Sequence, residues 1–158
     1  MSQKRALITG AGGFIGSALR RKLESAGWRA FCVIRRPSSD KTGGRAPGKE
    51  LFHDGTTEGM MRLMRRARPD VVFHLASLFL TDHKPADIEG LCRSNVLFGM
   101  QVLEAASAAK PSGFINTGTA WQHYNDADYN PVNLYAATKQ AFQDILDYYV
   151  QARGVRAV

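Results

Sequence analysis

Short apolar segments alternate along the chain with longer segments in which apolar side chains recur with a helical period. The short segments are rich in Val, Ile, Leu and Phe and predict buried β-strands. These strands are expected at 5–9, 30–34, 50–53, 71–75 and 113–117. The longer segments predict amphipathic helices at about 14–26, 57–67, 86–109 and 132–153.

This alternation predicts an α/β fold. Strands that follow one another through helices run parallel, and their apolar composition calls for helices on both faces of the sheet. Right-handed crossovers favour the doubly wound, Rossmann-type strand order 3-2-1-4-5. We expect a single domain over 1–158, with a loop at 37–48 and the start of a sixth strand, cut short, at 155–158.

The composition, 44% hydrophobic and 22% charged over 158 residues, is that of an ordinary globular domain. The longest apolar stretch, 71–80, contains His74 and is too short to cross a bilayer. We expect no secretory signal, because glycine-rich sequence begins by residue 10, and the lack of metal-like spacing between Cys32 and Cys92 predicts buried, reduced thiols. We therefore expect a cytoplasmic protein with no membrane contact and no metal site.

The net charge of +7 is concentrated in the first half of the chain. Residues 1–70 carry 15 basic and 6 acidic side chains, whereas residues 71–158 carry 6 and 8. A basic half can indicate nucleic-acid binding. However, the arginines at 62–68 fall on an expected amphipathic helix, where a solvated face accounts for them. A polyphosphate ligand explains the asymmetry better, and we expect no nucleic-acid partner.

A glycine-rich turn joins the first strand to the first helix. In Thr9-Gly-Ala-Gly-Gly-Phe-Ile-Gly16, Gly10 permits the tight turn and Gly13 lets the backbone approach a pyrophosphate. Gly16 lets helix and strand pack closely, so that phosphates rest on the helix N-terminus. The strand–turn–helix context makes this motif specific for a dinucleotide.

The spacing of Gly10, Gly13 and Gly16, with Phe14 and Ile15 between them, resembles the turn of the extended short-chain dehydrogenase/reductase family. In that family the turn binds NAD or NADP, and many members act on nucleotide sugars. Members normally continue with further strands and a smaller C-terminal substrate domain, which has no counterpart in these 158 residues. The resemblance therefore implies the nucleotide-binding part of an oxidoreductase.

The end of the second strand bears on the choice of cofactor. An acidic residue there accepts hydrogen bonds from the ribose of NAD, whereas arginine accommodates the 2′-phosphate of NADP. Here the strand is followed by Arg35 and Arg36, with no carboxylate before Asp40. Because the planar guanidinium suits a phosphate, we expect NADP, with NAD as the open alternative.

The resemblance assigns further cofactor-binding positions. Asp54, after the third strand, matches the family residue that bonds the adenine amine. Leu75, Ala76 and Ser77, after the fourth strand, match the segment that runs along the cofactor. Asn95 matches the family's Asn-Val stretch, which supports the site through backbone contacts; an ordinary surface asparagine is the alternative.

Tyr135 and Lys139 lie four residues apart in an expected helix and so share one face. A neighbouring ammonium stabilises the phenolate and brings the pKa of a tyrosine toward the operating range, while the lysine can also hold the nicotinamide ribose. The family places a third hydroxyl at the end of the fifth strand, four residues before an aromatic. Thr117, four before Trp121, has that spacing, and Thr119 is the reserve candidate.

Three reactions share this scaffold: dehydration, epimerisation and ketone reduction. Family dehydratases carry an Asp-Glu pair after the catalytic threonine, but Gly118 and Thr119 stand there, which disfavours elimination. The arginine pair points to NADPH and hence to reduction of a nucleotide-linked ketosugar, similar to CDP-abequose or CDP-paratose synthases. An NAD-dependent epimerase remains an alternative. So does a non-catalytic NADP sensor, although such proteins commonly lose the Tyr/Lys pair.

The helices near 86–109 and 132–153 carry more apolar positions than one sheet face should need. The residues in question are Leu91, Phe98, Val102, Phe142, Leu146 and Tyr149. In the resembling family these helices pair with a second copy in a four-helix bundle, so we expect a homodimer.

Overall fold

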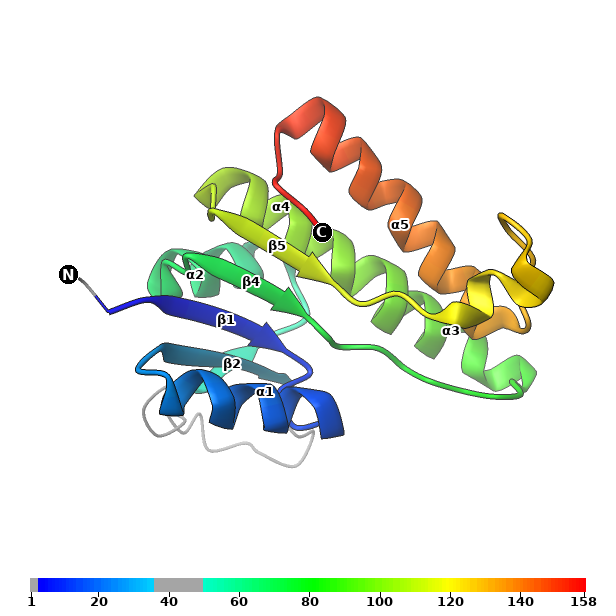
Figure 1. Cartoon of the computed structure of the whole chain (residues 1–158), viewed down its shortest axis with the longest axis horizontal. Helices are drawn as coiled ribbons and strands as arrows, with labels where there is room; N and C mark the ends of the chain where they lie inside the picture. The colour runs from blue at the N-terminus through cyan, green and yellow to red at the C-terminus, as the bar shows by residue number, and fades with distance from the viewer. Residues whose placement is uncertain (1–2, 36–49) are drawn as a thin grey trace.

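A computed structural model describes residues 3–35 and 50–158. Its centre is one sheet of five parallel strands in the order β3-β2-β1-β4-β5, as expected from the sequence (Figure 1). The strands are β1 (Arg5–Thr9), β2 (Arg29–Arg35), β3 (Glu50–His53), β4 (Val71–His74) and β5 (Gly113–Asn116). After β5 and its following helix, Ala157 forms an isolated parallel bridge with Phe114, where the sixth strand was expected to begin.

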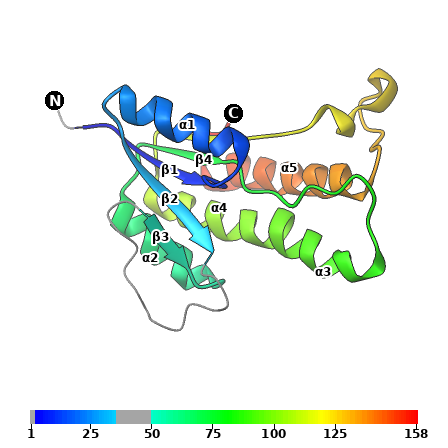
Figure 2. The same cartoon turned by 90° about the horizontal axis from the view of Figure 1, so that it is seen from below.

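Helices cover both faces of this sheet, as Figure 2 shows from below. Helix α1 (Phe14–Ser25) lies on one face, where Leu23 packs against a small core cluster that includes Ile8 and Cys32. The larger core lies on the other face and joins strands β1, β2, β3, β4 and β5 to three helices. These helices are α2 (Thr57–Ala67), α4 (Phe98–Ala109) and α5 (Leu134–Arg153).

The segment expected as one helix at 86–109 is composite. A 3-10 turn, η1 (Pro85–Asp87), leads into α3 (Ile88–Leu91), which continues as the π-helix η2 (Cys92–Leu97) before α4. Asn95 lies within the π-helix and is buried. Helical periodicity does not distinguish a π-turn, whose wider register is commonly found at functional sites.

The six apolar residues considered for a dimer interface are mostly covered within the chain itself. Leu91, Val102, Phe142, Leu146 and Tyr149 are buried, and Phe98 packs partly buried against the same core. The expectation of an exposed stripe made by these residues is therefore wrong, because α4 and α5 pack on each other as well as on the sheet. The large exposed apolar side chains on these two helices are Met100, Tyr148 and Val150.

Two other expectations have mixed outcomes. Cys32 is buried, but Cys92 is exposed, because it lies on the solvent side of the π-helix. The arginines at 62, 65, 66 and 68 are exposed along and just after α2, as a solvated face requires.

In the part of the chain that the structure describes, no helix combines the length and hydropathy needed to cross a membrane.

Candidate active site

A cleft of about 980 Å³ opens at the carboxyl ends of the strands. The glycine turn, the ends of β2 and β3, the segment after β4 and the π-helix line it. Six residues that the sequence assigned to cofactor binding lie on its wall: Gly10, Gly13, Asp54, Leu75, Ala76 and Ser77. The carboxyl edge of a doubly wound sheet, between strands on either side of β1, is where such folds bind ligands.

The glycine turn is packed so tightly at Gly10 and Gly16 that a side chain would not fit at either position. Gly10 has φ +70°, and a Cβ there would lie 2.7 Å from the amide nitrogen of Ala76. A Cβ on Gly16 would overlap the carbonyl oxygen of Gly10. The backbone that follows β1 therefore turns directly against the segment after β4. Without side chains at Gly10 and Gly16, the cleft beside this turn stays open.

Helix α1 begins at this turn with unpaired amides. Gly13 is its N-cap, and the first helical hydrogen bond runs from Ser17 N to Gly13 O at 2.9 Å. The amides of Phe14, Ile15 and Gly16 thus belong to the first turn, where a helix has no intrahelical acceptors and carries partial positive charge. The side chain of Phe14 is 93% exposed, so its contribution to an anion site is its backbone.

Asp54 lines the cleft but already has partners on α2. Its Oδ1 accepts hydrogen bonds from Thr56 N at 3.0 Å and Thr56 Oγ1 at 2.8 Å, and Arg62 donates to Oδ2 at 2.6 Å. The bonds from Thr56 lower the pKa of this carboxyl, with a smaller contribution from Arg62. Asp54 is therefore an anion at neutral pH, available to an amine at the cleft.

The two residues expected to select NADP are not placed by this geometry. Arg35 ends β2, beside the cleft wall formed by Val33 and Ile34. Arg36 lies outside the described residues, and the side chain of Arg35 is likewise not described.

Asn95 links the cleft to α5. Its Oδ1 accepts hydrogen bonds from Leu78 N at 2.7 Å and Ser77 Oγ at 3.2 Å. Its Nδ2 donates to Leu78 O at 3.0 Å and to Thr138 Oγ1 at 2.9 Å. The side chain is 3% exposed, so the alternative of an ordinary surface asparagine is wrong.

Tyr135 and Lys139 occupy consecutive turns of α5, on either side of Thr138. Lys139 is 4% exposed, and burial lowers the pKa of its ammonium from 10.5 to about 8. A cation held in a poorly solvated position interacts strongly with any negative charge that forms beside it. The Tyr135 ring meets that of Phe79 edge-on, with centroids 5.1 Å apart.

Thr117 directly follows β5, and its Oγ1 lies 3.4 Å from the carbonyl oxygen of His74, a long hydrogen bond. Thr119, the reserve candidate, is the N-cap of η3 (Ala120–Gln122), and its Oγ1 accepts from Trp121 N at 3.3 Å. Since the hydroxyl of Thr119 caps this turn, Thr117 has the side chain less committed to local structure.

The structure adds residues that sequence reasoning did not select. Gln122 is buried, accepts from Thr119 N at 3.0 Å and donates to Gln140 on α5 at 2.8 Å, which ties the segment after β5 to α5. Asn116 has a buried Oδ1 with no hydrogen-bond partner among the described residues. Only the position of Asn116, at the end of a strand, could have drawn attention in the sequence.

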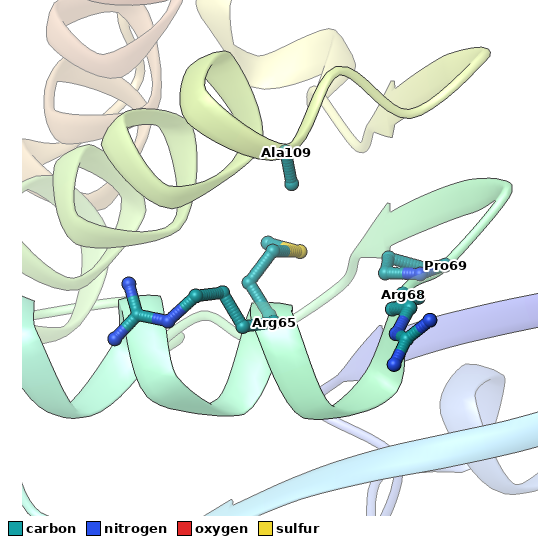
Figure 3. Close-up of a pocket in the computed structure, with 5 residues that line it drawn as sticks. Arg65, Arg68, Pro69 and Ala109 are labelled. Carbon is teal, nitrogen blue, oxygen red and sulfur yellow. The ribbon is translucent and has the colours of Figure 1, made fainter.

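A second pocket, of about 590 Å³, lies away from this edge, between the C-terminal ends of α2 and α4 (Figure 3). Met64, Arg65, Arg68, Pro69 and Ala109 line it. Figure 3 shows the side chains of Arg65 and Arg68 extending in different directions rather than toward a common point. This arrangement lacks the convergent polar groups of a ligand site. Across residues 3–35 and 50–158, no three His, Cys, Asp or Glu side chains are grouped to hold a metal.

Comparison with known proteins points to a single family. The model of the NAD dependent epimerase/dehydratase family matches residues 6–158. A CDP-abequose synthase of Yersinia pseudotuberculosis is 26% identical over 146 residues, covering 92% of this chain and 50% of that protein. A UDP-glucose 4-epimerase of Mycolicibacterium smegmatis is 27% identical over 164 residues, covering 92% and 51%.

Among solved structures, the UDP-glucose 4-epimerase of Thermus thermophilus in complex with NAD has a TM-score of 0.79 and 27% identity. That match covers 97% of this chain and 53% of the epimerase chain. The chain thus spans about half the length of the curated relatives it matches.

Proposed function

Because this chain belongs to the NAD dependent epimerase/dehydratase family, we propose that it is the nucleotide-binding part of an oxidoreductase that acts on a nucleotide sugar. One observation carries the proposal. Asn95 joins the wall of the glycine-lined cleft to Thr138, between Tyr135 and Lys139. Cofactor-binding and acid–base groups are thereby held in one rigid unit, as hydride transfer requires.

The described residues fit a nicotinamide dinucleotide. The pyrophosphate would rest on the first-turn amides of α1, over the turn at Gly10 where no Cβ fits. Asp54 would accept from the adenine amine, and the segment Leu75–Ser77 would run beside the ribose and nicotinamide. The bound cofactor supplies or accepts the hydride.

Tyr135 is the proposed general acid and base. Its phenol donates a proton to the sugar oxygen when a carbonyl is reduced, and takes one when an alcohol is oxidised. Lys139 stabilises the phenolate and holds the nicotinamide ribose, while Thr117 donates a hydrogen bond to the reacting oxygen. A buried ammonium suits this role because little water screens it.

Two observations point in different directions on the cofactor. Arg35 and Arg36 follow the end of β2, where guanidinium groups favour the 2′-phosphate of NADP. Solved relatives such as the Thermus thermophilus epimerase hold NAD. The arginine pair belongs to this chain itself, so we retain NADP as the proposed cofactor and NAD as the competitor to be tested beside it.

The proposed reaction is reduction of a nucleotide-linked ketosugar by NADPH. The similarity to a CDP-abequose synthase and the absence of an acidic pair after Thr117 support it. Epimerisation is the second candidate, and the similarity to UDP-glucose 4-epimerases favours it. We also propose a cytoplasmic homodimer, whose contact would involve Met100 and Tyr148 rather than the buried residues of the same helices.

Turnover assays separate these candidates. A reductase oxidises NADPH in step with loss of the ketosugar, an epimerase interconverts UDP-glucose and its 4-epimer without net change in the cofactor, and a sensor binds cofactor and does neither. In the full-length enzyme, Tyr135→Phe should abolish turnover and leave cofactor affinity nearly unchanged, whereas Lys139→Ala should lower both turnover and cofactor affinity. Equal, mild effects of the two substitutions would refute the assigned roles.

A further inference from the structure

Phe79 is an exposed aromatic side chain beside the proposed proton donor. It follows the cleft-lining segment Leu75–Leu78, and 54% of its surface is exposed although its backbone is firmly held. Its ring meets Tyr135 edge-on, with an interplanar angle of 82°, and lies 5.5 Å, centroid to centroid, from Trp121. The two neighbours come from different segments, one from α5 and one from η3.

Two asparagines hold the backbone on either side of Phe79. Asn95 brackets Leu78 by bonding both its N–H and its carbonyl oxygen, at 2.7 and 3.0 Å. Asn133 donates from Nδ2 to the carbonyl oxygens of Leu80 and Thr81, at 3.3 and 3.0 Å. Phe79 is therefore fixed between two side-chain clamps.

Both clamps also engage α5. Asn95 bonds Thr138, whose hydroxyl donates to Tyr135 O at 2.7 Å, and Asn133 caps the helix by accepting from Ala136 N at 2.9 Å. The backbone position of Phe79 relative to α5 is thus set by hydrogen bonds, and its ring contacts Tyr135 and Trp121. The half of Phe79 that stays in solvent adds no burial to the described fold, and a backbone held in place lowers the ordering cost of a contact with a ligand.

We infer that Phe79 and Trp121 form a platform for the C–H face of the pyranose ring that reacts at Tyr135. The inference rests on the proposed function and names the part of the nucleotide sugar that these residues contact. A sugar ring presents polar hydroxyls at its edge and C–H groups on its faces, so an aromatic surface can cover a face without burying hydroxyls. Sites for small polar ligands commonly combine such apolar walls with a few directed polar groups.

The platform makes Phe79 a specificity-determining residue rather than a catalytic one. It selects how the ring is turned toward Tyr135: a pyranose whose C–H face lies on the Phe79 ring has the Trp121 ring, tilted by 44°, at its side, and its edge oxygens point past the platform. Substitution of Phe79 should therefore weaken the sugar contact without affecting the dinucleotide.

Saturation-transfer difference NMR on this chain tests the platform. UDP-glucose and CDP-glucose serve as probes, each with NADP⁺ and with NAD⁺ in parallel samples. In the unmodified protein the pyranose ring protons should receive saturation. In Phe79→Ala that saturation should fall relative to the base protons, and sugar-nucleotide binding should weaken roughly two- to tenfold, the range of one aromatic contact. Phe79→Tyr should restore both.

Two further variants sharpen the test. Tyr148→Ala removes an exposed aromatic of α5 about 20 Å along the helix from Tyr135, and should leave pyranose saturation and sugar-nucleotide affinity unchanged. Asn133→Asp keeps an acceptor for the helix cap but loses the two donor bonds to the segment after Phe79, and should reproduce part of the Phe79→Ala effect. Circular dichroism checks that each variant is folded.

The outcomes are distinguishable. The platform is overturned if the cofactor protons are saturated but the pyranose protons are not, or if pyranose saturation is unchanged in Phe79→Ala. Either result leaves the proposed function standing. An unmodified protein that gives no signal from either dinucleotide overturns the proposed function and the platform with it.

Discussion

Thr9 and His74, in register on neighbouring strands, share a hydrogen bond inside the sheet: Thr9 Oγ1 lies 3.0 Å from His74 Nδ1. The same hydroxyl accepts from Ala76 N–H at 3.2 Å, so its own hydrogen is available to the imidazole. An imidazolium has no lone pair to accept it. The arrangement therefore favours a neutral His74 beneath the cleft.

Burial lowers the pKa of His74 from 6.5 to about 3, and the nearby Lys139 ammonium adds to the effect. In the unfolded chain this histidine takes up a proton below its ordinary pKa, whereas the folded protein does not. Stability is therefore fully present above pH 6.5 and is lost as the pH falls toward 3.

Urea titrations at about pH 7.5 and about pH 5 test this behaviour. From about pH 7.5 to about pH 5, the free energy of unfolding should fall by about 2 kcal/mol more in the unmodified protein than in His74→Gln. Glutamine keeps a hydrogen-bond acceptor at this position but does not titrate. Identical pH dependence in the two proteins would show that His74 does not stay neutral in the fold.

Gly10→Ala should destabilise the protein by about 2 kcal/mol and abolish dinucleotide binding. Its φ of +70° is unfavourable for alanine, and the added Cβ would press on Ala76 N. Gly12→Ala is the matched control for stability, because a Cβ there meets nothing within 4 Å. Chemical unfolding of both variants measures the difference, and equal stabilities would contradict the tight approach of β1 to the segment after β4.

Much of this architecture could be predicted from the sequence, because strand–helix alternation and the glycine turn are local patterns with a local physical cause. The π-helix was not predictable in this way. Asn95 within it bonds Leu78 and Thr138, which lie 17 and 43 residues away, so tertiary contacts define its surroundings.

The same limit applies to Phe79 and to the apolar residues of α4 and α5. A phenylalanine in a loop carries no sign in the sequence that two asparagines hold its backbone. The periodicity of α4 and α5 indicates that one face of each helix is apolar. It does not indicate whether that face contacts the sheet or a second copy of the chain. In the structure it meets the sheet and the neighbouring helix.

Lys139→Met should raise stability near neutral pH by about 1–3 kcal/mol while abolishing turnover. Burial lowers the pKa of the Lys139 ammonium to about 8, whereas the unfolded chain holds that proton up to its ordinary pKa of 10.5. The charged lysine therefore destabilises the fold below pH 8, and stability rises between pH 8 and 10.5. Thermal unfolding without cofactor measures the gain. Lys22→Met, at an exposed position of α1, should show no such gain, and a loss of stability in Lys139→Met would refute the assignment.

The proposed homodimer is tested by light scattering at micromolar concentration. A mass of about twice the single-chain 17.4 kDa supports it, and a mass near 17.4 kDa refutes it. If the contact involves the exposed faces of α4 and α5, the double substitution Met100→Lys and Tyr148→Lys should shift the protein to the single-chain mass. Phe14→Lys, which alters another exposed apolar residue away from these helices, should leave the assembly unchanged.

Calorimetric titration of the unmodified chain with NADPH and NADH, beside the Arg35→Ala, Arg36→Ala double variant, tests both the dinucleotide site and its preference for NADP. We expect saturable binding of one dinucleotide per chain, with NADPH preferred by about ten- to a hundredfold, the value of one charge-assisted hydrogen bond to the phosphate. The double variant should lose that preference and retain NADH binding. Tighter binding of NADH by the unmodified chain would overturn the NADP assignment, and no binding of either dinucleotide would show that the cleft is not a dinucleotide site.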